Sequence, residues 1–95
     1  MLGVSASLAE RLLEVFARTT PPLLDELRAA VEGGEHDAAR KLAHKLRSST
    51  ETVGATRLAE LARQIELGEE AEAAVAELHA VYRGTLDELE QLVAR

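Results

Sequence analysis

The sequence predicts an all-α fold, an up-down antiparallel four-helix bundle that forms a single domain over residues 1–95. Apolar residues recur three or four positions apart in four successive segments, which is the spacing of one helix face. Leu, Ala, Glu and Arg dominate the chain, and all four favour helices, whereas aromatic residues make up only 2%. Short glycine-containing connections separate the segments, so neighbouring helices are expected to run antiparallel.

The first helix is expected to begin near Ser7. Leu8, Leu12, Val15 and Phe16 share one of its faces. Pro21-Pro22 interrupts the pattern, because proline lacks the backbone N–H that a helix interior needs. We therefore expect a helix that is bent or split at this pair and that ends at Gly33-Gly34.

Three further helices are expected over residues 35–53, 55–67 and 70–94. In the first of them, the predicted inward stripe consists of Ala39, Leu42, Leu46, Ser49 and Val53. Gly54 and Gly68 end the first two helices. The last helix keeps its apolar spacing through Gly84.

Composition excludes several classes of protein. A net charge of −6 disfavours nucleic acid as a partner, because phosphate neutralisation needs a basic surface. No apolar stretch approaches the length of a membrane span, and no secretory signal is present, so we expect a cytoplasmic protein that does not bind membranes. Cysteine is absent, and neither a metal-ligand motif nor a phosphate-binding glycine loop occurs. These absences disfavour a metal site and a hydrolytic or metal-dependent enzyme.

The charge is unevenly distributed. Four basic residues and no acid occur between positions 38 and 47, whereas five Glu and no base occur between positions 66 and 77. We call the first group the basic patch; it consists of Arg40, Lys41, Lys45 and Arg47. A basic patch on an acidic protein suggests a docking surface for an acidic partner.

His44 is the candidate functional residue. On a helical wheel at about 100° per residue, it lies about 180° from the centre of the predicted inward stripe. It is therefore expected to project into solvent, where its imidazole would be largely neutral and nucleophilic near pH 7. Arg40, Arg47, Ser48 and Glu51 are expected on the same outer face. The other two histidines fit a surface position near a helix start (His36) and a boundary packing position (His79).

The local sequence resembles the signature of the histidine-containing phosphotransfer (HPt) domain family. The resemblance rests on residues 43–49, AHKLRSS, followed by Val53-Gly54-Ala55. Leu58, Leu61 and Ile65-Glu66 are similar to the next helix of the family, and Val15-Phe16 and Pro21 to its first, proline-bent helix. The resemblance extends over nearly the whole chain.

The resemblance implies specific roles. His44 would accept a phosphoryl group on Nε2, and Glu66 would hold the Nδ1–H of its ring. Arg47, in the usual Lys position, would offset phosphate charge, and Ser48, in the usual Gly position, would lie near the phosphoryl group. Arg40, Lys41, Lys45 and Glu51 would contact the partner.

The family also implies partners, namely receiver domains of response regulators and a hybrid histidine kinase. The receiver would supply Mg²⁺, so this chain is expected to bind no cofactor. It would act as a covalent phosphoryl carrier in a two-component phosphorelay and not as a turnover enzyme. A monomer is expected, because all four helices lie in one chain.

Two alternatives stay open. The bundle could bind and regulate receivers without efficient phosphotransfer, and Ser48 is the residue that raises this possibility. It could also resemble a dimeric kinase-like phosphotransferase, in which a two-helix hairpin carries the histidine and two chains complete the bundle.

Overall fold

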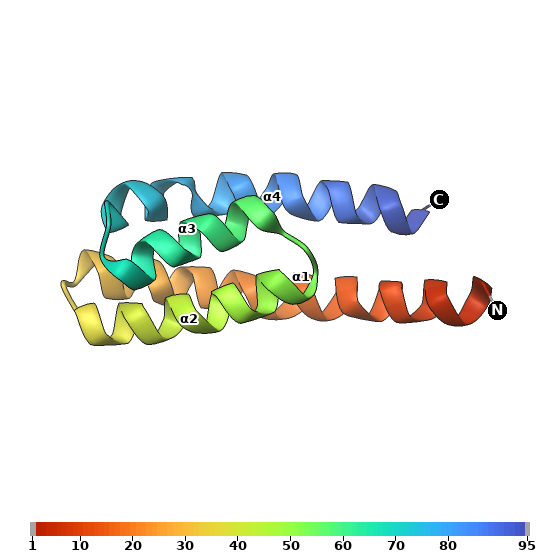
Figure 1. Ribbon diagram of the computed structural model, residues 1–95, viewed down its shortest axis with the longest axis horizontal. Helices are drawn as coiled ribbons and strands as arrows, with labels where there is room; N and C mark the ends of the chain where they lie inside the picture. The colour runs from red at the N-terminus through yellow and green to blue at the C-terminus, as the bar shows by residue number, and fades with distance from the viewer. Residues whose placement is uncertain (1, 95) are drawn as a thin grey trace.

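The computed structural model describes the backbone of residues 2–94 and the side chains of residues 8–94. It contains four helices, α1 (Leu2–Glu32), α2 (His36–Thr52), α3 (Thr56–Leu67) and α4 (Ala71–Ala94), joined by residues 33–35, 53–55 and 68–70 (Figure 1). No strand occurs in the described chain, so the all-α prediction is confirmed. None of the described helices is long and apolar enough to cross a membrane.

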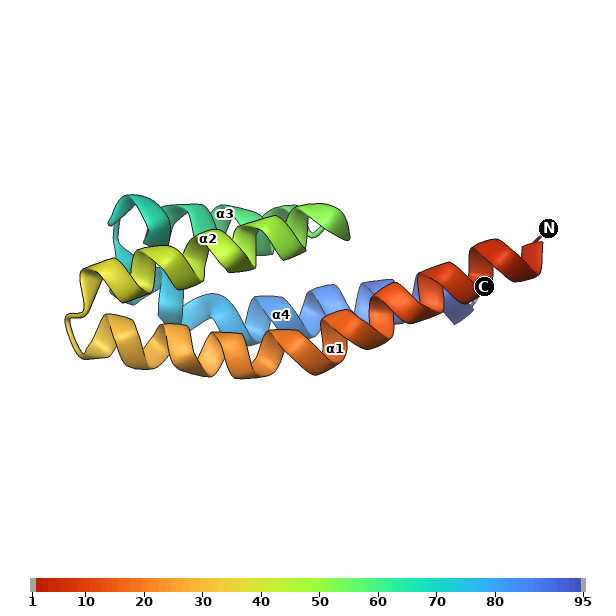
Figure 2. The same cartoon turned by 90° about the horizontal axis from the view of Figure 1, so that it is seen from below.

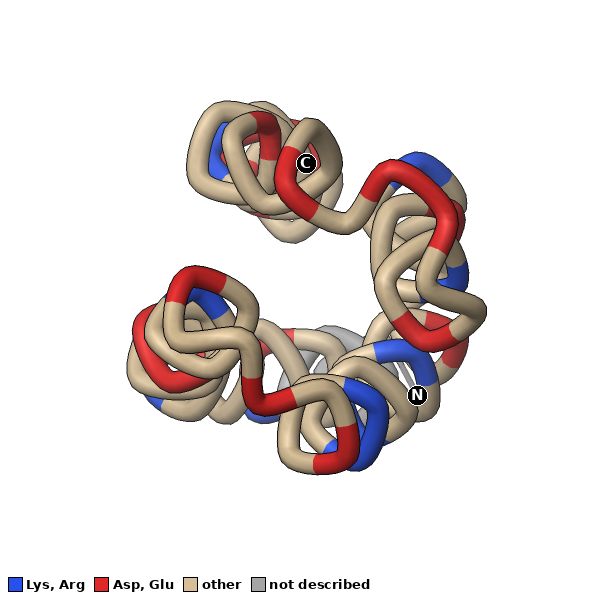
Figure 3. Tube along the Cα trace, turned by 90° about the vertical axis from the view of Figure 1, so that its left-hand side faces the viewer, with Lys and Arg blue, Asp and Glu red and all other residues tan. Residues whose placement is uncertain are grey.

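The helices form the predicted up-down bundle. α1 contacts α2 and α4, and α3 contacts α2 and α4, so the helices follow one another around a common core. Figure 3 looks along the bundle and shows this arrangement, with acidic segments on all four helices and basic segments concentrated at the bottom of the view, where α2 lies. The molecule is elongated, with dimensions of 48 × 19 × 18 Å.

α1 differs from the prediction at its start. It begins at Leu2, so Ser7 lies inside the helix. It continues through Pro21 and Pro22, and Figure 2 shows that it bends along its length, so of the two predicted outcomes the helix is bent and not split. Pro21 has no N–H to donate to the carbonyl of Ala17, and the hydroxyl of Tyr82 on α4 donates to that carbonyl instead, at 3.4 Å. The neighbouring helix thus replaces a hydrogen bond that the proline removes.

Two turns place α2, α3 and α4 side by side. Gly54 has φ +74° between α2 and α3, and Gly68 has φ +73° after α3. This left-handed conformation strains residues with a Cβ, which explains glycine at both positions. The N–H of Gly68 donates to the carbonyl of Ile65 at 3.1 Å and so caps the end of α3. The first turn brings the end of α3 alongside the middle of α2.

The core consists mainly of leucines that the four helices contribute. Those buried to less than 2% exposure are Leu24, Leu27, Leu46, Leu58, Leu61 and Leu78. Burial of such side chains supplies most of the free energy that stabilises a bundle.

The buried face of α2 is rotated relative to the prediction. Ala39 and Leu46 are buried as predicted, but Ala43 and Thr50 are also buried, whereas the predicted Leu42, Ser49 and Val53 are only half-buried. At about 100° per residue this moves the centre of the buried face by about 50° and leaves His44 about 130° from it. His44 therefore lies on the flank of α2 and not directly opposite the core.

The apolar face predicted for the start of α1 is only partly buried. Phe16 is buried, and its ring centroid lies 5.4 Å from that of Tyr82. Leu8, Leu12 and Val15 are exposed, and α1 extends beyond the ends of α2 and α3 at this end of the bundle (Figures 1 and 2).

Candidate functional site

The site is built where α2 and α3 lie side by side. His44 comes from the middle of α2, and its side chain is 60% exposed, as the sequence predicts. Glu66 comes from the last turn of α3, and its side chain is only 19% exposed. The Nδ1 atom of His44 lies 2.9 Å from Oε2 of Glu66, which is a hydrogen-bond distance.

This contact determines the tautomer of the imidazole. A carboxylate can only accept a hydrogen bond, so Nδ1 of His44 carries the proton and donates it to Glu66. In the neutral ring the other nitrogen, Nε2, then has a free lone pair. None of the described residues forms a hydrogen bond with Nε2, so that lone pair is available to an incoming group.

Arg47 completes a three-residue cluster. It lies one turn after His44 on α2, and its Nε is 3.3 Å from Oε1 of Glu66. Both of these atoms are buried, and they form an ion pair without good hydrogen-bond alignment. The Nη2 atom of Arg47 is 3.2 Å from Nδ1 of His44. Because Nδ1 already donates to Glu66, the guanidinium acts toward the ring as a nearby positive charge. Glu66 thus holds His44 through one oxygen and Arg47 through the other.

The remaining predicted residues surround this cluster on α2. Arg40, Lys41, Lys45, Ser48 and Glu51 are all exposed. Arg40 pairs with Asp37 at 3.7 Å, while Lys41 and Lys45 form no ion pair with a described residue. The carbonyl of Ser48 accepts a hydrogen bond from Thr52 at 3.1 Å. All five predicted residues are thus accessible, but among the described residues only Glu66 and Arg47 form a hydrogen bond or ion pair with His44.

Arg63 is a neighbour of this site that the sequence analysis did not identify. It lies on α3, one turn before Glu66, and lines a hollow of about 530 Å³ between α2 and α3 together with Arg47 and Glu51. It forms no ion pair with any described residue. Its three-residue separation from Glu66 is a helical spacing and was the available signal.

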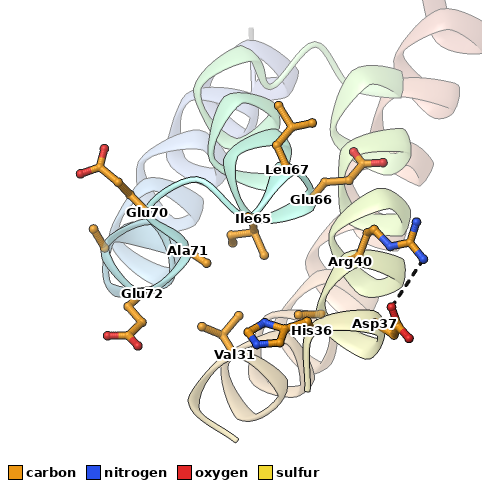
Figure 4. Close-up of a pocket in the computed structure, with 13 residues that line it drawn as sticks. Val31, His36, Asp37, Arg40, Ile65, Glu66, Leu67, Glu70, Ala71 and Glu72 are labelled. Carbon is orange, nitrogen blue, oxygen red and sulfur yellow. Dashed lines mark ion pairs between the residues drawn. The ribbon is translucent and has the colours of Figure 1, made fainter. Parts of the chain in front are cut away.

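A larger hollow, of about 860 Å³, lies at the end of the bundle on the other side of Glu66 (Figure 4). Four carboxylates line it, from Asp37, Glu66, Glu70 and Glu72, and outnumber its one guanidinium, from Arg40, which makes it a poor site for a phosphate group. Figure 4 shows Glu66 reaching from α3 toward α2 at its edge. Over the described residues, no group of three or more His, Asp or Glu side chains is placed to hold a metal ion.

A second histidine has a similar set of neighbours but a different geometry. His79 on α4 lies between Asp25 and Arg28 of α1. Its Nδ1 is 3.0 Å from Nη2 of Arg28, and its Nε2 is 3.3 Å from Oδ1 of Asp25. A guanidinium can only donate, so Nδ1 accepts, and Nε2 carries the proton toward Asp25. Both ring nitrogens are engaged, in agreement with the boundary packing position predicted for His79.

The chain was compared with known proteins. A family model described as the Hpt domain matches residues 11–95, which include all of α2, α3 and α4 and most of α1. Neither the curated proteins nor the solved structures contain a match. Hpt domains carry phosphoryl groups in two-component signalling and are not turnover enzymes. The matched length, the four-helix bundle and the exposed histidine agree, and the chain belongs to the Hpt domain family.

Proposed function

We propose that this chain relays a phosphoryl group between aspartates of receiver domains, with His44 as the carrier. The observation that carries the proposal is the 2.9 Å contact between Nδ1 of His44 and Glu66, which leaves Nε2 free to react on a side chain that is 60% exposed. The partners would be receiver domains of response regulators and a hybrid histidine kinase, consistent with membership of the family.

In the proposed reaction, the lone pair on Nε2 attacks the phosphorus of a receiver's aspartyl phosphate. A P–N bond forms, the P–O bond to the aspartate breaks, and the aspartate leaves as a carboxylate. The imidazole keeps its proton on Nδ1 and so acquires a positive charge. Glu66, 2.9 Å from Nδ1, offsets that charge. Attack by an aspartate of a second receiver reverses these steps and returns His44 to its neutral form.

Arg47 and the basic patch would act at different distances from the reaction. Arg47 lies next to the ring and is held by Glu66, so its charge is placed to offset that of a phosphoryl group on Nε2. Arg40, Lys41 and Lys45 would contact the acidic surface around a receiver's active site, together with Glu51. The receiver would supply Mg²⁺, because its carboxylates and not those of this chain would surround the transferred group.

Ser48 supports a second candidate function. It is exposed on α2 one turn after His44, and at this position the family usually has Gly. A side chain here lies where a receiver would approach, and it could permit binding while slowing transfer. In that case the chain would regulate receivers by occupying them. Comparison of wild type with Ser48→Gly decides between the two, because only an obstructive Ser48 would make the variant transfer faster.

Two assays test the main proposal. Phosphoramidate, a small phosphoryl donor, reacts without a receiver, so it reports on His44 alone: its P–N bond breaks, ammonia leaves and a phosphohistidine forms. We expect wild type to acquire one acid-labile phosphoryl group, and His44→Gln to acquire none while it keeps its helical circular dichroism. His79→Gln is the matched control, and it should label as wild type does.

The labelled chain is then mixed with purified receiver domains of the host, and loss of label from His44 is followed as label gained on an aspartate. Labelling of His44→Gln at the wild-type level would refute the assignment of the carrier. Labelling of His44 without transfer to any receiver would instead favour the regulatory function.

A further inference from the structure

α3 has one arginine whose charge no other described residue uses. The helix contains two arginines, Arg57 and Arg63. Arg57 pairs with Glu60 at 3.6 Å and with Glu77 at 3.1 Å. Arg63 is exposed and forms no ion pair with a described residue. Its guanidinium donors are therefore available to a group outside the described chain.

Arg63 lies beside His44 on the outer side of α2 and α3, which run next to each other (Figure 1). At about 100° per residue, Arg63 lies about 60° from Glu66 and further from the buried face of α3. Along the helix axis it lies about 4.5 Å from Glu66, the residue that holds His44. Arg63 also lines the hollow of about 530 Å³ together with Arg47 and Glu51, so it faces α2.

The cations of α2 do not supply an unpaired charge on this side of His44. Helical spacing places two of them on the half of α2 that faces away from α3, namely Lys41 and Lys45. The other two lie on the α3 side, and each already pairs with a carboxylate, Arg40 at 3.7 Å and Arg47 at 3.3 Å. Among the described residues, Arg63 is thus the cation without a partner where α3 meets the surface of His44.

Two carboxylates line the same hollow, and neither pairs with Arg63. Glu60 pairs with Arg57. Glu51 comes from α2 and forms no ion pair with a described residue. The hollow therefore has an unpaired cation on its α3 wall and an unpaired anion on its α2 wall. A protein surface that fits it presents a carboxylate to Arg63 and a basic side chain to Glu51.

We propose that Arg63 is a docking residue that binds a carboxylate on the surface of a receiver domain, while Glu51 binds a basic side chain of the same receiver. The inference rests on the proposed function, in which a receiver brings its aspartyl phosphate to His44. His44 lies on the flank of α2 next to α3, so a receiver that reaches Nε2 covers part of both helices. Arg63 gives α3 a charged contact in a surface that the sequence analysis assigned to α2 alone.

Binding and transfer with the purified receiver domains of the host test this assignment. Isothermal titration with each unphosphorylated receiver measures the Kd, and transfer of label from phosphorylated His44 measures the rate. For each receiver that binds wild type, we expect Arg63→Glu to raise the Kd more than about ten-fold, because repulsion replaces attraction. Arg63→Gln should raise it by up to about five-fold, which is the upper range for an exposed ion pair. Transfer at low receiver concentration should slow by the same factors.

Two further variants separate a local contact from the effect of net charge. Arg83→Glu is the matched control, because Arg83 is exposed on α4, which does not contact α2, and the charge changes by the same amount. It should change the Kd by less than about two-fold. Glu51→Arg adds positive charge, so a general attraction to an acidic receiver would lower the Kd. The proposed contact of Glu51 predicts a higher Kd instead.

Three outcomes would overturn the inference while receivers still bind wild type and the proposed function stands. Arg63→Glu binds receivers as Arg83→Glu does, or Glu51→Arg binds them more tightly than wild type. In the third outcome, phosphoramidate labels Arg63→Glu as slowly, relative to wild type, as this variant passes label to receivers. Because phosphoramidate needs no docking, Arg63 would then act on the reaction itself. If no receiver binds wild type or accepts its label, the proposed function and this inference are both refuted.

Discussion

Replacement of Glu66 by Ala removes the residue that holds both His44 and Arg47. We expect two separable effects, one on the free energy of unfolding and one on the rate at which His44 is phosphorylated. The size of each follows from the exposure of the atoms that lose their partner.

The stability effect comes mainly from Arg47. Its Nε is buried and faces Oε1 of Glu66 at 3.3 Å. This atom has no hydrogen bond in the wild type, so Glu66→Ala removes the ion pair. Loss of one partner of a buried ion pair costs about 3–5 kcal/mol, whereas an exposed ion pair contributes about 1 kcal/mol or less. Because the Arg47 side chain is 32% exposed and can turn partly toward water, we expect a loss of about 1–2 kcal/mol in the free energy of unfolding.

The rate effect comes from His44. A hydrogen bond to a charged group contributes about 1.5–3 kcal/mol, but the His44 side chain is 60% exposed and solvent replaces part of this. A remaining contribution of about 1 kcal/mol to the transition state, where the ring becomes positive, corresponds to a labelling rate about five-fold lower. Glu66→Gln should fall between wild type and Ala, because its amide has one acceptor oxygen for two donors.

Urea unfolding and the initial rate of phosphohistidine formation with phosphoramidate, followed by phosphorus NMR, measure the two effects. Glu77→Ala is the matched control, because Glu77 pairs with Arg57 at 3.1 Å on an exposed surface away from His44. It should change stability by less than about 1 kcal/mol and leave the rate unaltered. A Glu66→Ala variant that folds and labels within two-fold of wild type would refute the proposed role of Glu66.

Three further predictions concern the bundle itself. Gly54→Ala should lower the free energy of unfolding by about 1–2 kcal/mol, because φ of Gly54 is +74°. Gly84→Ala should raise it by about 0.5–1 kcal/mol, because Gly84 is helical with open space at its Cβ position. Urea unfolding measures both changes, and two changes of the same sign would contradict this reasoning. Thr20→Val should raise the free energy of unfolding by about 1 kcal/mol, because the buried Thr20 hydroxyl has no hydrogen-bond partner. Thr50→Val should lower it by about 1 kcal/mol, because the Thr50 hydroxyl donates to the Arg47 carbonyl at 2.8 Å. The same urea unfolding measures both variants, and a Thr50→Val variant that is more stable than wild type would refute this reasoning. Burial first, and then the charge of Glu90, raise the pKa of Tyr82 above 10.0, so the folded state holds this proton more tightly than the unfolded state and the free energy of unfolding should fall as the pH rises above about 10. Tyr82→Phe should remove the part of this fall that comes from the phenol. If urea unfolding of the variant shows the same dependence on alkaline pH as wild type, the phenol is not its source.

The helix pattern was predictable because apolar spacing and glycine turns act locally. The three connections occur close to where the glycines indicated, and α2, α3 and α4 have nearly the expected bounds. The prolines left two outcomes open, a bent helix or a split one. Whether Pro21 splits a helix depends on what replaces the missing hydrogen bond, and the replacement comes from Tyr82, which is distant in sequence.

The exposure of His44 was also predictable, but its contacts required the fold. Spacing alone placed His44 opposite the predicted stripe, because that stripe included Leu42, Ser49 and Val53, which are only half-buried. Ala43 and Thr50 are small enough to lie where α2 packs closely, and their burial rotates the helix and turns His44 toward α3. The assignment of Glu66 came from the family resemblance, since periodicity says nothing about which residues of two helices meet. The exposed start of α1 was not foreseen, because an apolar stripe does not indicate how far the neighbouring helices extend.

The two histidines that contact acidic and basic side chains show why residue type alone does not define a nucleophile. His44 and His79 each lie beside one carboxylate and one arginine. The partners of His44 both approach Nδ1, one from its own helix and one from α3, and leave Nε2 without a hydrogen bond to a described residue. The partners of His79 both come from α1 and approach opposite ring nitrogens, so the imidazole links α4 to α1 and keeps no free lone pair. The position of the neighbouring helix therefore decides which of the two rings keeps a free lone pair.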